Sequence, residues 1–166
     1  MHPTHVPLRL ATGAYILNSG LSKWGADEET AAGLHGMASG AYPFLSSLKP
    51  TDFAQLLAAG ETALGAALLF PKVPSAVAGA ALAGFGAGLI GMYLRTPGLT
   101  QDDGIRPTPD GVPIAKDVWL VGAGLTLATQ SFLSGAKSAA KSASRSAKAK
   151  ASDLGQSARE SLPFTA

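Results

Sequence analysis

Residues 52–95 read DFAQLLAAGETALGAALLF, then PKVPS, then AVAGAALAGFGAGLIGMYLR, and the expected architecture follows from this stretch. Two long apolar segments flank a short turn that carries one lysine between two prolines. From Phe53 to Phe70 the first segment has a single charge, Glu61, near its centre, and the second segment has none before Arg95. An apolar run of about 18 residues or more can cross the hydrocarbon core of a bilayer as a helix. The pattern therefore predicts a membrane hairpin with helices at about 53–70 and 73–95.

The composition also favours a membrane chain. Only 14% of the 166 residues are charged and 20 are glycine, and small residues allow membrane helices to pack closely. The chain has no cysteine, which excludes disulfides and the usual ligation of iron–sulfur clusters. His2, His5 and His35 fall outside the predicted spans, so we predict no haem within the bundle and no metal site.

Two more spans are predicted around the hairpin, at about 6–24 and 113–133. The first is less apolar than the hairpin and needs protein neighbours to cover its polar groups. The sequence between it and the hairpin is too broken by Gly and Pro to span. There we predict a short interfacial segment with Asp27 as a helix N-cap, with a soluble excursion as the alternative.

The predicted fold class is therefore all-α. Residues 1–134 form a four-helix bundle in the membrane, and residues 135–166 form a basic tail rich in Ala, Ser and Lys. The tail is expected to be a solvated helix or a disordered segment, because no apolar stripe balances its cations.

Small residues recur every four positions along the second helix of the hairpin. One row comprises Ala76, Ala80, Gly84 and Gly88, and the other comprises Gly79, Ala83, Ala87 and Gly91. Since the rows lie on two faces, we expect this helix to approach two neighbours closely.

Basic residues near the helix ends predict the orientation in the plasma membrane. The tail carries Lys137, Lys141, Arg145, Lys148 and Lys150 soon after the last predicted span. Four spans then place both termini in the cytoplasm, and the loops after Trp24 and Arg95 outside. We also predict that the tail binds anionic lipid, with nucleic acid as the rival partner.

Glu61 is the centre of the candidate site, because a carboxylate at the bilayer midplane is costly unless it is protonated, paired or beside water. Arg9 can extend toward Glu61 from one side and Lys116 from the other, so pairing with either residue is expected, with an unpaired Glu61 as the alternative. The candidate cluster of intramembrane polar residues is Arg9, Asn18, Lys23, Glu61, Arg95, Lys116 and Asp117. Three interpretations stay open: a structural clamp, a ligand pocket that opens outward, and a proton-conducting site.

Three quoted segments resemble the DoxX family of membrane proteins. They are LRLATGAYILNSGLSKW at 8–24, AAGETALGAALLFPKVPSAVAG at 58–79 and KDVWLVGAGLTLA at 116–128. The resemblance covers roughly residues 7–132, in the manner of an actinobacterial member, and the basic tail lies outside the family pattern. It implies a four-helix integral membrane protein, and some members are associated with quinone-linked oxidoreductases or membrane redox-stress complexes.

Two classes of function are therefore expected. In the first, the chain is an accessory or anchoring subunit of a membrane redox complex, without catalysis of its own. Any redox centre is then a bound quinone or belongs to a partner, and Asn18, Lys23 and Lys116 could donate hydrogen bonds to a quinone. In the second, the chain is a carrier of small solutes or lipids, or a membrane scaffold.

Overall fold

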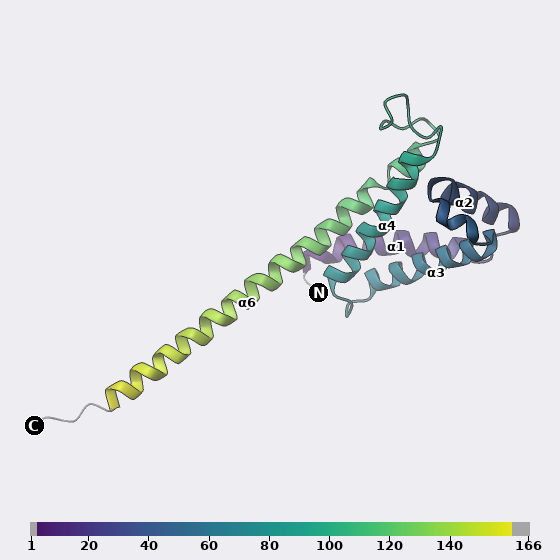
Figure 1. The fold of residues 1–166 in the computed structure, drawn as a ribbon. Coiled ribbons are helices and arrows are strands. Elements are labelled where there is room, and N and C mark those ends of the chain that lie inside the picture. Colours follow the sequence, from purple (N-terminus) through teal and green to yellow (C-terminus); the bar gives the residue numbers. More distant parts are fainter. Residues whose placement is uncertain (1–2, 161–166) are drawn as a thin grey trace, which may run out of the picture. The chain divides into compact units, whose positions relative to one another are not determined.

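The computed structural model describes residues 3–160, and within that range the fold is all-helical with no strand (Figure 1). The α-helices are α1 (Val6–Lys23), α2 (Glu28–Ala41), α3 (Pro50–Leu69), α4 (Ser75–Arg95), α5 (Val112–Ala115) and α6 (Val118–Glu160). Two short 3-10 helices are η1 (Pro3–His5) and η2 (Pro43–Ser47). The chain divides into two compact units, Met1–Thr129 and Gln130–Ala166.

Proline and capping residues set several helix ends. Pro7 and Pro50 lie in the first turns of α1 and α3, where the missing N–H costs nothing. The Asp27 side chain accepts a hydrogen bond from the Thr30 N–H at 2.9 Å, so the predicted N-cap of α2 is confirmed. This bond lowers the pKa of Asp27 below its ordinary value.

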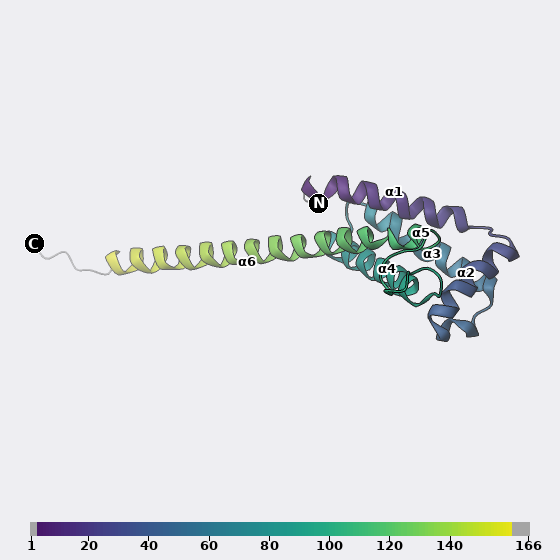
Figure 2. The same ribbon diagram turned by 90° about the horizontal axis from the view of Figure 1, so that it is seen from above.

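Glycines bring α1 and α3 into backbone contact, and the two helices lie side by side in both ribbon views (Figures 1 and 2). A Cβ added at Gly20 would lie 2.5 Å from the backbone N of Thr62. A Cβ at Gly65 would collide with the backbone of Leu17. Only glycine allows so close an approach at these positions.

A second close contact joins α4 to the beginning of α6. A Cβ at Gly79 would lie 2.7 Å from the Gly124 carbonyl oxygen, and one at Gly124 would collide with the backbone of Ala83. The row that contains Gly79 therefore packs as predicted. The other row differs, because a Cβ at Gly84 or Gly88 would meet no atom within 4 Å.

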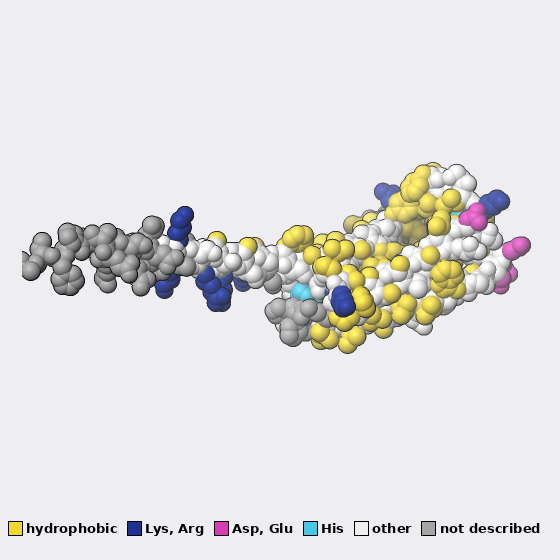
Figure 3. Space-filling view, turned by 90° about the horizontal axis from the view of Figure 1, so that it is seen from below, with side chains coloured by type: hydrophobic (Ala, Val, Ile, Leu, Met, Phe, Trp, Pro, Cys, Tyr) yellow, Lys and Arg dark blue, Asp and Glu magenta, His cyan; other side chains and the backbone are white. Residues whose placement is uncertain are grey.

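One apolar core joins the four long helices of the first unit. Its buried members are Ile16 from α1, Leu68 from α3, Ala78 and Leu82 from α4, and Leu120, Ala123 and Leu127 from α6. Many other large apolar side chains face outward, and Figure 3 shows them spread over the visible face of this unit. They include Leu10 and Leu21 on α1, Leu56 on α3, Val77 and Leu94 on α4, and Leu125 on α6.

The predicted spans agree with α1, α3 and α4 to within a few residues. The last predicted helix differs at both ends. Its first turn is the separate helix α5, and α6 begins at Val118 and continues through much of the tail to Glu160. The high helix propensity of alanine accounts for a helical tail, which was one of the two alternatives.

Two helical stretches are long and apolar enough to cross a membrane, Ser75–Arg95 and Val112–Ser146. Length and composition alone define this property, and the core helix of a soluble protein can share it. Helices α1 and α3 fall short of it, because charged and polar residues such as Lys23 and Glu61 interrupt their apolar sequence.

Candidate functional site

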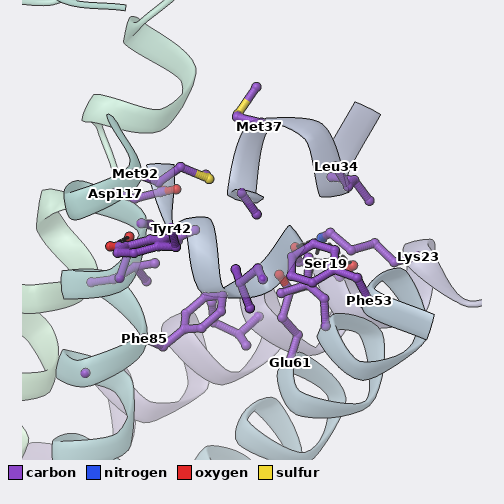
Figure 4. A pocket seen from close by; sticks show the side chains of 18 of the residues that line it. Ser19, Lys23, Leu34, Met37, Tyr42, Phe53, Glu61, Phe85, Met92 and Asp117 are labelled. Atoms are coloured by element: carbon purple, nitrogen blue, oxygen red, sulfur yellow. Dashed lines mark hydrogen bonds and ion pairs between the residues drawn. The ribbon is translucent and has the colours of Figure 1, made fainter. Parts of the chain in front are cut away.

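A pocket of about 340 Å³ lies between α1, α2, α3, α4 and the start of α6 (Figure 4). Most of its wall is apolar. The larger wall side chains are Tyr15 from α1, Met37 from α2, Phe53 from α3, Phe85 and Met92 from α4, and Leu120 from α6. Gly84 and Gly88 also line it, so the row of small residues on α4 that contains these two glycines provides open space instead of a helix contact.

The principal polar feature of the pocket is an ion pair between α1 and α3. Lys23 Nζ lies 2.8 Å from Glu61 Oε2, and Glu61 is only 4% exposed. The same ammonium donates to the backbone oxygen and the hydroxyl oxygen of Ser19, at 3.0 and 2.7 Å. Three acceptors therefore match the three N–H donors of the lysine, which is the condition under which a buried ion pair is tolerated.

The close approach of α1 and α3 positions this pair. Gly20 packs against the backbone of Thr62, the residue after Glu61. The indole N–H of Trp24 donates to the Thr62 hydroxyl at 3.0 Å. These contacts hold the last turn of α1 beside the middle of α3. Lys23, at the end of α1, therefore reaches Glu61, in the middle of α3.

Asp117 brings a second carboxylate to the pocket, from the link between α5 and α6. Its side chain is buried, with the residue 8% exposed, and Oδ1 has no hydrogen-bond partner among the described residues. Figure 4 shows it beside Met92 and Tyr42, with Lys23 and Glu61 on the other side of the view. The pocket thus combines a satisfied ion pair with a carboxylate oxygen that can still accept.

Tyr42 connects the end of α2 to α4 along the pocket wall. Its hydroxyl donates to the Gly88 carbonyl oxygen at 2.8 Å, and the absence of a side chain at Gly91 leaves room for it. The Arg95 guanidinium lies 5.2 Å from the centre of the Tyr42 ring, a cation–π distance. Arg95 therefore supports the wall from outside and does not belong to the pocket lining.

The prediction that Arg9 pairs with Glu61 is wrong. Arg9 is 1% exposed and donates to five oxygens at the end of α3, in the turn that follows and at the first residue of α4. Nε donates to Leu68 O, Nη1 to Val73 O and Ser75 Oγ, and Nη2 to Ala67 O and Phe70 O, at 2.6–3.0 Å. These carbonyls lack helical partners, and the negative end of the helix dipole favours a cation there.

The prediction that Lys116 pairs with Glu61 is also wrong. Lys116 is exposed and faces a different hollow, beside Ile105 and Val118. Asn18 is exposed on α1 and does not line the pocket. Of the seven residues in the predicted cluster, the pocket brings together Lys23, Glu61 and Asp117.

Sequence reasoning missed Ser19 and Tyr42. Ser19 had a usable signal, because it precedes Lys23 by four residues and so shares its helix face. Tyr42 had none, because it follows a Gly-rich helix whose packing direction the sequence does not specify.

Within residues 3–160, no group of three or more His, Cys, Asp or Glu side chains could hold a metal ion. The pocket residues thus offer hydrogen bonding, charge and apolar contact. A scan against protein-family models and searches of the curated proteins and of the solved structures found no match to this chain.

Proposed function

We propose that this chain is an integral membrane protein that binds a lipophilic small molecule in the pocket and catalyses no reaction alone. In this proposal α1, α3, α4 and the beginning of α6 are the four spanning helices. The observation that carries it is an apolar pocket with a few polar groups, the half-buried Lys23 and the buried Glu61 and Asp117, which is the usual composition of a small-molecule site.

The distribution of side chains supports a membrane environment for all four helices. Large apolar residues such as Leu10, Leu56 and Leu125 face outward at more than half exposure. Three of the charged side chains of α1 and α3, Arg9, Lys23 and Glu61, face inward, where Arg9 and Lys23 find acceptors; Asp52 is exposed in the first turn of α3. A helix with apolar side chains on its outer face and charged side chains toward its protein neighbours can lie in lipid. Its overall composition can then be less apolar than that of a transmembrane helix without neighbours.

The resemblance to the DoxX family suggests the setting in which the pocket works. We propose an accessory subunit of a quinone-linked or oxidative-stress complex, in which the pocket holds a quinone-type molecule near a partner's redox centre. The chain contains no cysteine, so electron transfer would use that molecule or the partner. The alternative is a carrier of a small lipophilic solute, which would use the same pocket.

The pocket itself can be tested by filling it. Gly84 lines the pocket and Gly60 does not, and an added Cβ meets no atom within 4 Å at either position. We would purify wild type, Gly84→Leu and Gly60→Leu from native membranes in a mild detergent and identify extracted lipophilic molecules by mass spectrometry. The proposal expects one molecule to accompany wild type and Gly60→Leu and to be lost from Gly84→Leu. Equal recovery from all three proteins, or none from wild type, would contradict it.

A further inference from the structure

We propose that the pocket selects a lipophilic amine, whose ammonium group pairs with Asp117. This inference rests on the proposed function, because it names the chemical class of ligand for that pocket. It begins from Asp117 Oδ1, a buried carboxylate oxygen without a hydrogen-bond partner among the described residues. A buried acceptor without a donor carries a desolvation cost, and a ligand that supplies a donor there removes that cost.

Two donors of the pocket wall, the Lys23 ammonium and the Tyr42 hydroxyl, are directed at acceptors other than Asp117. Lys23 Nζ donates to Glu61 and to both oxygens of Ser19, and the Tyr42 hydroxyl donates to the Gly88 carbonyl. No described residue donates to Asp117 Oδ1, so this oxygen remains an acceptor in the pocket wall. A head group that donates hydrogen bonds complements this arrangement better than one that only accepts.

Charge points to the same head group. The charged residue types that line the pocket are one basic residue, Lys23, and two acidic residues, Glu61 and Asp117. Lys23 pairs with Glu61, so no basic residue of the lining pairs with Asp117. Lys116 is the nearest further cation in sequence, but it is exposed and lies outside the lining. An ammonium group supplies both the missing charge and the missing donor.

The walls suit the remainder of such a molecule. Tyr15, Phe53 and Phe85 offer aromatic surface from three helices, and Met37 and Met92 offer flexible thioethers. Aromatic faces attract cations, and methionine adapts to varied apolar shapes. The volume of about 340 Å³ admits a molecule with one ring and a short chain.

Three probes with one body and different heads test the inference. These are 4-phenylbutylamine, 4-phenylbutanol and 4-phenylbutyrate, titrated by calorimetry into the full chain in nanodiscs of neutral lipid, with empty nanodiscs subtracted. We expect the amine to bind about tenfold or more tighter than the alcohol, the ratio typical of a charge-assisted hydrogen bond, and the acid to bind weakest. Equal affinity for amine and alcohol, tighter binding of the acid, or no binding of the amine would overturn the inference.

Two variants assign the preference to Asp117. Asp117→Asn keeps the size of the side chain and should bring the amine and alcohol affinities within about twofold of each other. Lys116→Gln alters the adjacent exposed charge and should keep the amine preference. An amine preference that persists in Asp117→Asn would overturn the assignment, and the wild-type probe series stands even if that variant does not fold.

The two proposals fail in different ways. If the pocket binds a lipophilic molecule that Gly84→Leu displaces but shows no amine preference, only the head-group inference fails. If the wild-type protein carries no such molecule and Gly84→Leu binds the amine as well as wild type, the pocket proposal fails too.

Discussion

Arg9 shows how a charge inside a helical bundle can serve the backbone instead of another charge. All five of its N–H donors find acceptors in residues 67–75, which comprise the end of α3, the following turn and the first residue of α4. The side chain thereby fixes the first part of α1 to the α3–α4 turn.

Arg9→Lys should be strongly destabilising. A lysine keeps the charge but has three donors at one point, so it cannot reach the five oxygens, and each buried carbonyl left without a partner costs about 1–3 kcal/mol. We expect the unfolding temperature in detergent to fall well below that of wild type. Lys72→Arg, in the exposed turn, is the control and should unfold like wild type. A wild-type unfolding temperature for Arg9→Lys would show that these bonds contribute little.

The Lys23–Glu61 pair predicts a specific pattern of mutant stabilities. Lys23→Met removes the partner of a buried carboxylate and should cost about 3–5 kcal/mol. Glu61→Gln keeps an oxygen that can accept from Lys23 and should cost less. The double variant Lys23→Met with Glu61→Leu should recover much of the loss, because it leaves no unpaired charge. A double-mutant cycle measured by unfolding in detergent checks this, and strictly additive losses would exclude coupling between the two side chains.

For single residues, the sequence indicates which buried charges are important more clearly than it indicates which residues they pair with. Glu61 stands out because it is the only charge in its predicted span. Its partner could not be predicted, because residue depth along a helix axis says nothing of which helix face meets which neighbour. The last turn of α1 lies beside the middle of α3, so Lys23 reaches Glu61 while Arg9 lies near the other end of α3.

Among the elements, α1 and α3 depend most on glycine. Gly65→Ala would place a methyl group on the backbone of Leu17, where no flexible side chain can give way. We expect a loss of about 1–3 kcal/mol from overpacking. Gly60→Ala, in the same helix with open space around the added methyl, should instead gain up to about 1 kcal/mol from helix propensity. Unfolding measurements that show the same sign for both variants would contradict the close contact.

The tail part of α6 carries five exposed basic residues, for which we propose anionic lipid as the partner. These are Lys137, Lys141, Arg145, Lys148 and Lys150. Each contributes about 1 kcal/mol near an anionic surface, and salt weakens the attraction. A peptide of residues 135–160 should bind vesicles that contain anionic lipid at low salt and leave them at high salt. A peptide that ignores the vesicles but binds duplex DNA would favour nucleic acid instead.

Element boundaries were largely predictable because proline, capping residues and long apolar runs specify them locally. Asp27 capping α2 is one example. The helix in the tail was less predictable, because alanine favours helix without an apolar stripe to indicate what that helix packs against. The direction of α2, which carries Met37 to the pocket, depends on tertiary contacts such as the Tyr42–Gly88 hydrogen bond.

At the scale of the first unit, the helices divide into two closely packed pairs, α1 with α3 and α4 with the start of α6. The N-terminal segment and the α3–α4 turn lie at one end of this unit, and α2 lies at the other end of α1 and α3 (Figures 1 and 2). The small residues that make the pairs were visible in the sequence. The pocket was not visible in the sequence, because it is the space left where Gly84 and Gly88 of α4 lack a close neighbour.

We propose that these four helices cross the membrane with both termini in the cytoplasm. The chain has no cysteine, so single cysteines can report on each loop directly. Asp102→Cys lies in the loop after α4, and Lys72→Cys lies in the turn between α3 and α4. Intact cells would be treated with a membrane-impermeant maleimide before and after permeabilisation. We expect Asp102→Cys to be labelled in intact cells and Lys72→Cys only after permeabilisation. Labelling of both positions from the same side, or recovery of the protein in the soluble fraction, would contradict this topology.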